Sequence, residues 1–194
     1  MKNRKTRSAM RRMLFTLALV LVVAVASVGG TIAWLTATTE TVTNTFTTSD
    51  ISIELAETTG DSYKIVPGAT VNKDPKATVK SGSEKCYLYV KITNNLVLSN
   101  NTVATYNINT TDWNLVGESG NTKLYCYNGI VDASTAAVEK TVFTQVTYDG
   151  EKITKENIEQ LKDKTIVLQA YAHQSDHTTK EVADAAAKAW AGIN

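Results

Sequence analysis

The chain has 194 residues, with 20 Lys and Arg against 19 Asp and Glu, and a net charge of +1. Residues 1–33 hold six of the cations and no acid, so residues 34–194 carry 14 lysines against 19 acids, a net charge of −5. An acidic segment without arginine repels phosphates, which excludes nucleic acid and anionic membrane surfaces as electrostatic partners.

The N-terminal region has the pattern of a secretory signal peptide. Six cations precede an apolar run over residues 13–28, which breaks at Gly29-Gly30 and is followed by Thr31-Ile32-Ala33. A basic start, a short apolar core and a small residue at the exit are typical of such signals. The run is shorter than the roughly 20 residues that a membrane-spanning helix needs. We therefore predict that residues 1–33 direct export and are removed, so that the chain meets a membrane only before cleavage.

Residues 34–49 form a threonine-rich extension behind that cleavage site. Threonine is β-branched and favours extended backbone, and neither glycine nor proline interrupts the segment. Its large apolar residues are Trp34, Leu35, Val42 and Phe46. A segment so poor in apolar residues gains little by folding alone, but its backbone can pair with a sheet edge as a donor strand. The alternative is a solvated linker.

Residues 50–194 predict a single all-β domain, because short alternating runs recur between turn residues. We expect strands over residues 51–55, 86–93, 103–108, 112–116, 123–127, 141–148 and 165–174. Within 86–93, alternation sets Tyr87, Tyr89 and Lys91 opposite an apolar face, which predicts a sheet with one solvated face. Many short strands joined by turns favour an antiparallel β-sandwich.

One or two short helices are predicted at the periphery of this sandwich. Thr154 is placed to cap a helix that runs to Leu161. Thr178 and Glu181 have the spacing of a capping box ahead of a C-terminal helix, and Gly192 suits the end of that helix. The predicted apolar stripe of the C-terminal helix consists of Val182, Ala186, Ala189 and Trp190.

The domain has two cysteines, Cys86 and Cys126, both in strand-like runs. Each has apolar neighbours at its own parity along the strand, which directs each thiol toward a core. A disulfide between them would close a loop of about 40 residues, and export permits such a bond without requiring it. The alternative is two buried free thiols that pack as small apolar side chains. The residues leave both interpretations open.

His173 and His177 are the candidates for a metal site. On a helix, their spacing would place both imidazoles on one face, as in zinc peptidases. Here the segment is the end of a predicted strand and a turn, and the glutamate of the H-E-x-x-H motif is missing. We expect two surface histidines, no metal and no cofactor. The sequence also lacks a G-x-S-x-G motif, a P-loop and a dinucleotide motif, so we do not expect an enzyme.

Three blocks of sequence follow one another in an order that characterises one family. The first is Gly29-Gly30-Thr31-Ile32-Ala33-Trp34 with Asn44-Thr45-Phe46, and the second joins Val66-Pro67-Gly68 to residues 83–92. The third is Ala170-Tyr171-Ala172-His173-Gln174, ahead of a helix that contains Trp190. Together they resemble the TasA/camelysin family of exported Gram-positive proteins, over most of the chain. Ser49 stands near the position where the family has a glycine.

The resemblance implies a jelly-roll-like sandwich that a dedicated SipW-type signal peptidase processes. It also implies self-association into extracellular fibres of a biofilm matrix or cell surface, with the freed N-terminal segment inserted into a neighbouring subunit's sheet. Other matrix or cell-surface proteins are further expected partners. Two alternatives stay open. One is a monomeric secreted binding or accessory module, such as a minor fibre component or adhesin, and the other is an exported metallopeptidase of the camelysin type.

Cleavage should fall between Ala33 and Trp34, because the small residue Ala33 directly precedes the bond and Thr31 stands at the third position before it. The competing site follows Ala26, since Ala24-Val25-Ala26 also fits the small-residue rule. The intact mass of the secreted protein distinguishes the two sites. We expect Trp34 at the mature N-terminus, and Ser27 there would contradict the prediction.

Overall fold

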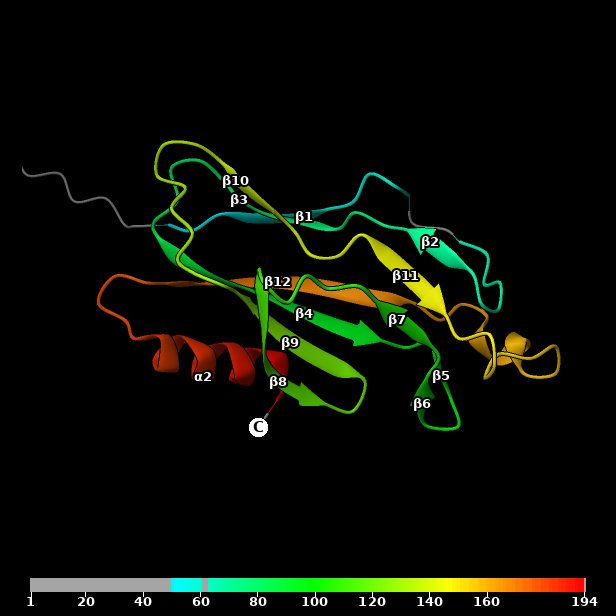
Figure 1. Cartoon of the computed structure of the whole chain (residues 1–194). Helices are drawn as coiled ribbons and strands as arrows, with labels where there is room; N and C mark the ends of the chain where they lie inside the picture. The colour runs from blue at the N-terminus through cyan, green and yellow to red at the C-terminus, as the bar shows by residue number, and fades with distance from the viewer. Residues whose placement is uncertain (1–49, 61–62, 194) are drawn as a thin grey trace, which may run out of the picture. The chain divides into compact units, whose positions relative to one another are not determined.

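The computed structural model describes residues 50–60 and 63–193, which belong to one compact unit, Thr48–Asn194. The predicted signal peptide, the Ala33–Trp34 bond, and Leu35, Val42 and Phe46 of the extension lie outside the described residues. Within the described ranges the chain is mostly antiparallel strand with one α-helix, as Figure 1 shows. No helix in this part of the chain is both long enough and apolar enough to cross a bilayer.

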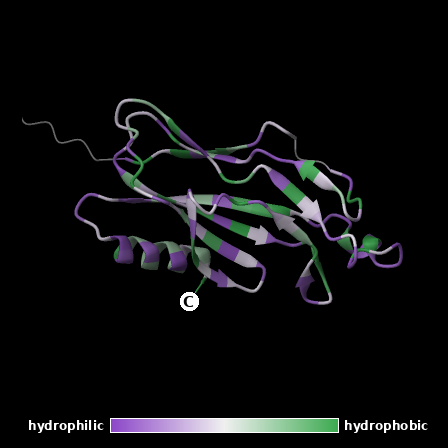
Figure 2. Cartoon of the chain, in the orientation of Figure 1, coloured by the Kyte–Doolittle hydropathy of each residue, from purple (hydrophilic) through white to green (hydrophobic). Residues whose placement is uncertain are grey.

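The largest sheet is antiparallel throughout and has the strand order β12-β4-β9-β8. Its strands are β12 (Ile166–Gln174), β4 (Cys86–Asn94), β9 (Thr122–Tyr127) and β8 (Trp113–Ser119). β12 and β4 pair over nine residues in unbroken register. β8 has a register shift between Leu115 and Gly117. Hydrophobic and hydrophilic bands alternate along the strands (Figure 2), as expected for a sheet that faces a core.

The opposing layer consists of two three-stranded sheets that run into one another. One contains β1 (Ile53–Ala56), β3 (Lys76–Val79) and β10 (Val138–Thr141), and the other β2 (Thr70–Asn72), β11 (Gln145–Tyr148) and β7 (Ala104–Tyr106). Hydrogen bonds from Val142 N to Pro75 O (2.9 Å) and from Lys73 N to Thr144 O (2.8 Å) bridge the gap between them. Pro75 has no N–H to return a bond, which explains the interruption. The predicted strand 141–148 is therefore divided between β10, which ends at Thr141, and β11, which begins at Gln145.

The larger hydrophobic core lies between these two layers. Leu88 and Val90 of β4 and Val79 of β3 are fully buried in it. Trp113 of β8 is also buried there, and its Nε1 donates to Thr141 O of β10 at 2.9 Å. Burying each of these large side chains stabilises the fold by about 1.5–3 kcal/mol. The predicted all-β sandwich is confirmed, while its jelly-roll connectivity stays a prediction.

The other face of the β12-β4-β9-β8 sheet is covered by the helix α2 (Lys180–Ala191). Tyr89 is fully buried beneath Ala183 and Ala187, whose small side chains permit close packing. The prediction of a solvated face at Tyr89 is therefore wrong. The buried side of α2 also differs from the predicted apolar stripe, because Val182, a member of that stripe, is 57% exposed. Alternation within β4 indicates two faces but does not show that a distant helix covers the second.

The ends of α2 follow local sequence signals. Thr179 is the N-cap, and Gly192 ends the helix in the left-handed conformation, at φ 71°. The helix expected from Thr154 is reduced to one 3-10 turn, η1 (Ile158–Leu161). Leu161 is buried in the larger core, so this turn fixes the chain just ahead of β12.

Candidate functional site: an open strand edge

The two histidines lie at the end of β12 and in the turn after it. His173 Nδ1 is 2.9 Å from Gln174 O, and its ring packs beside Tyr171. His177 is exposed and has a positive φ of 58°. The described residues contain no group of three or more His, Cys, Asp or Glu side chains that is arranged to hold a metal ion. His173 and His177 therefore belong to no such group among the described residues.

Cys86 and Cys126 lie on opposite faces of one sheet. Cys86 belongs to the larger core, whereas Cys126 is opposite Tyr89 in register and lies in the core under α2. Because neighbouring residues of a strand point to opposite faces, these two thiols cannot meet while the sheet is intact. Both are free and fully buried. Of the two interpretations that the sequence left open, the structure has the free thiols.

Most edges of the described sheets are short or protected. β1 has four residues and an ion pair between Glu54 and Lys80 (3.0 Å), and β2 and β7 have three residues each. On β10, the carbonyl oxygen of Thr141 already accepts a hydrogen bond from Trp113. On β8, Leu115 is half-exposed, but the register shift directly after it interrupts the ladder. Short length, charges and bulges are the features by which proteins prevent pairing at an edge.

β12 has none of these protections. It is a nine-residue edge strand with no proline and no Lys, Arg, Asp or Glu, and its ladder with β4 has no bulge. Val167 on its outer face is 43% exposed. A long, regular, uncharged edge is a template for pairing with a further strand. β12, orange in Figure 1, is therefore the candidate functional site.

Two hydrogen bonds at the ends of β12 show which of its backbone groups face the open edge. Asn95 N donates to Thr165 O (3.0 Å) just before the strand, and Ser175 N donates to Lys85 O (2.9 Å) just after it. In an antiparallel pair, residues that exchange bonds alternate with residues whose N–H and C=O point away. The odd-numbered residues of β12 thus bond to β4. The even-numbered ones present their N–H and C=O at the edge.

These edge-facing residues also have inward side chains that are incompletely covered. Ile166, Leu168 and Ala172 are only partly buried against the larger core, and so are Ile53 and Leu55 of β1. β1 approaches β12 within 8 Å, Cα to Cα, yet no ladder joins the two strands. No described residue hydrogen-bonds to the edge-facing backbone groups of residues 166–172. This β1–β12 seam combines unpaired backbone with half-buried apolar side chains.

The opposite side of the sandwich is filled by aromatic rings. Tyr106 stacks on Phe143 with centroids 5.3 Å apart and meets Tyr125 edge-on at 6.3 Å. Trp113 meets Tyr127 edge-on at 5.6 Å. Such pairs add about 0.5–1.5 kcal/mol beyond the area they bury. The larger core thus has aromatic packing on this side and is incompletely covered along the β1–β12 seam.

Over residues 50–60 and 63–193, the fold is an all-β sandwich in which the edge of β12 is unprotected. No protein-family model, no curated protein and no solved structure matches the chain.

Sequence reasoning predicted a donor segment but did not predict an open strand edge. It predicted a strand over residues 165–174 without placing that strand at an edge. The available signal for an unprotected strand is the run without Lys, Arg, Asp or Glu between Lys164 and Asp176. Charges of this kind are what usually protect an edge strand from pairing. An uncharged run is equally typical of a central strand, so this signal alone does not distinguish the two positions.

Cys86 and Cys126 should react with a thiol reagent such as DTNB only after unfolding. Burial raises the pKa of the Cys86 thiol to about 11 and also raises the pKa of Cys126. Little thiolate therefore forms near about pH 8, and the sheet and α2 block access to both sulfurs. We expect two reactive thiols in guanidinium and none in the native protein. Rapid native labelling, or an unreduced mass lower by two hydrogens, would contradict this.

Proposed function

We propose that the protein is an exported structural subunit that assembles into extracellular fibres by strand addition. In this proposal, residues 34–47 of one copy are the donor strand and β12 of another copy is the acceptor. The observation that carries the proposal is the unpaired, uncharged edge of β12, nine residues long. The sequence supports the donor, because export and cleavage after Ala33 would place a threonine-rich segment at the very N-terminus.

Backbone hydrogen bonds would supply the general affinity between donor and acceptor. The edge offers the N–H and C=O of Ile166, Leu168, Ala170 and Ala172, in the alternate spacing that a paired strand requires. Each new bond contributes about 0.5–1.5 kcal/mol net. The donor segment contains neither proline nor glycine, so every residue can donate and the backbone favours the extended form.

Apolar side chains of the donor would set its register. Val42 and Phe46 are four residues apart, so in a strand they lie on one face. That face would meet the larger core at the β1–β12 seam, where Ile53 and Leu55 are half-buried. Burying both donor side chains would contribute about 3–6 kcal/mol before the cost of ordering the segment. A shift by one residue would direct both to solvent, which disfavours other registers.

This pairing would produce fibres, because donor and acceptor are different surfaces. A head-to-tail contact between unlike surfaces repeats without closing unless its rotation happens to complete a ring. A SipW-type signal peptidase would be the partner that frees the donor, and the assembled protein would belong to the matrix or surface of a Gram-positive cell. The charge-free edge of β12 favours this function over a monomeric module, which would gain nothing from an unprotected edge.

Deleting residues 34–47 should leave a folded monomer that cannot form fibres, because the acceptor edge then has no donor. Phe46→Asp should weaken assembly more than Thr38→Asp, since both add one charge but only Phe46 is expected to enter the core. Electron microscopy and sedimentation of the purified proteins measure this. Fibres of normal length from the deletion variant would show that residues 34–47 are a linker.

Ala170→Pro should abolish fibre formation while the subunit stays folded. Ala170 N–H faces the open edge, so proline there removes no bond to β4 but prevents a donor strand from pairing. Ala170→Ser is the matched control, because it keeps the N–H at the same position. Thermal unfolding verifies that both variants fold. Fibres from a folded Ala170→Pro protein would exclude β12 as the acceptor.

A further inference from the structure

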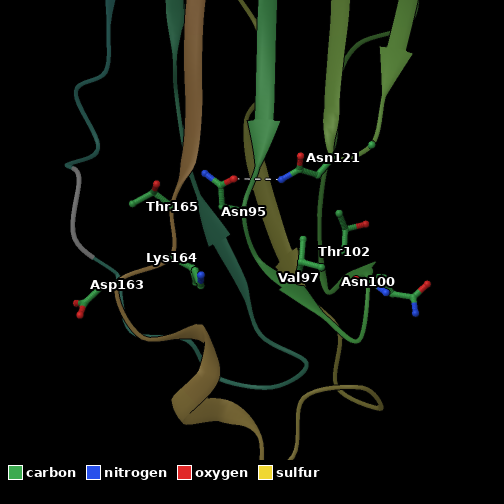
Figure 3. Close-up of a pocket in the computed structure, with 10 residues that line it drawn as sticks. Asn95, Val97, Asn100, Thr102, Asn121, Asp163, Lys164 and Thr165 are labelled. Atoms are coloured by element: carbon green, nitrogen blue, oxygen red, sulfur yellow. Dashed lines mark hydrogen bonds between the residues drawn. The ribbon is translucent and has the colours of Figure 1, made fainter. Parts of the chain in front are cut away.

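A polar hollow of about 770 Å³ opens at the end of the domain where β4 stops (Figure 3). Three segments that are distant in sequence line it. They are the stretch from Asn95 through the hairpin of β5 (Val97–Leu98) and β6 (Asn101–Thr102), the β8–β9 turn at Asn121, and residues 163–165 ahead of β12. The hollow is therefore built by the fold and not by one loop.

Hydrogen bonds behind the hollow hold its wall in place. Asn94 is buried, its Nδ2 donates to Ala104 O at 2.8 Å, and its Oδ1 accepts from Leu96 N at 3.1 Å. Asn95 N donates to Thr165 O at 3.0 Å, which joins the β4 end to the segment before β12. A wall fixed in this way is preformed, so a ligand would not need to order it.

Two amides on this wall present a donor and an acceptor side by side. Asn121 Nδ2 donates to Asn94 O at 2.9 Å and to Asn95 Oδ1 at 3.1 Å, and Figure 3 marks the second bond. Because both partners are acceptors, the nitrogen of Asn121 must point toward them. Asn95 Nδ2 and Asn121 Oδ1 are left without a hydrogen-bond partner among the described residues. They are available to a ligand.

The other lining residues select an uncharged ligand with many hydroxyl groups. Asp163 and Lys164 are the charged residues of the lining, and their charges are opposite. This set lacks the basic cluster that phosphate requires and the several carboxylates that a divalent cation requires. Further amides and hydroxyls complete the lining: Asn100, Asn101, Thr102 and Thr165. We propose that this hollow binds a neutral saccharide, whose hydroxyls each donate and accept a hydrogen bond.

An adjoining smaller hollow gives room for a second sugar ring. Its volume is about 210 Å³, and it shares Thr102 and Asn121 with the first. Tyr106 and Tyr125 line it, with their hydroxyl oxygens 3.4 Å apart. The combined site suits a disaccharide unit or the end of a longer glycan. It does not depend on strand addition, because none of the residues that line it belongs to β12.

Titration of the full-length protein with neutral disaccharides, followed by amide chemical shifts in NMR, tests the proposal. Maltose, lactose, cellobiose and N,N′-diacetylchitobiose are the probes, each at up to about 10 mM, because dissociation constants near the millimolar range are expected. At least one probe should shift the amides of residues 95–102, 120–121 and 163–165. The absence of shifts with all four probes, or shifts confined to other residues, would overturn the proposal.

Asn95→Asp should weaken binding of the responding probe about two- to tenfold, because it replaces the free donor with an acceptor. It keeps the oxygen to which Asn121 bonds, so the wall is retained. Thr102→Val is a second variant that removes a lining hydroxyl without a change of shape. Asn114→Asp, an exposed residue outside the hollow, is the control for charge. Unchanged affinity in both Asn95→Asp and Thr102→Val would overturn the assignment.

Discussion

The unbroken nine-residue ladder between β4 and β12 determines both proposed sites. Its hydrogen-bond phase directs the N–H and C=O groups of Leu168, Ala170 and Ala172 away from β4, which creates the unpaired edge. The bond just beyond its end, from Asn95 N to Thr165 O, brings the segment before β12 to the end of β4, where the polar hollow opens. A one-residue slip of this ladder would reverse both faces and remove both sites.

β4 also divides the interior into two cores, and this explains several properties together. Leu88 and Val90 face the sandwich, whereas Tyr89 faces α2, where its hydroxyl donates to Asp184 Oδ1 at 2.8 Å. Because Cys86 and Cys126 take opposite faces of this sheet, oxidation cannot link them within the folded chain. The sheet is thus packed on both faces, and the ladder along its exposed edge strand has no bulge. Proteins usually blunt such an edge, so its persistence here favours a role in pairing.

Local signals predicted much of the fold and little of the sites. Alternation located β4 and β12 almost to the residue, and Gly192 correctly marked the end of α2. The covered face at Tyr89 was missed because it depends on contact with Ala183 and Ala187, about a hundred positions later in the chain. The edge position of β12 depends on strand order, and the hollow depends on three distant segments. Neither feature is encoded in a local period of hydrophobic residues. The donor role of Val42 and Phe46 rests on sequence alone and stays a prediction.

Residue-resolved hydrogen exchange of the β12 amides, before and after assembly, tests the central claim most directly. In the isolated subunit, the amides of Leu168 and Ala170 should exchange quickly, while those of Gln169 and Tyr171, which bond to β4, should be protected. In assembled fibres, all four amides should be protected. Slow exchange at Leu168 and Ala170 in the isolated subunit, or rapid exchange there in fibres, would contradict an open edge that accepts a strand from another copy.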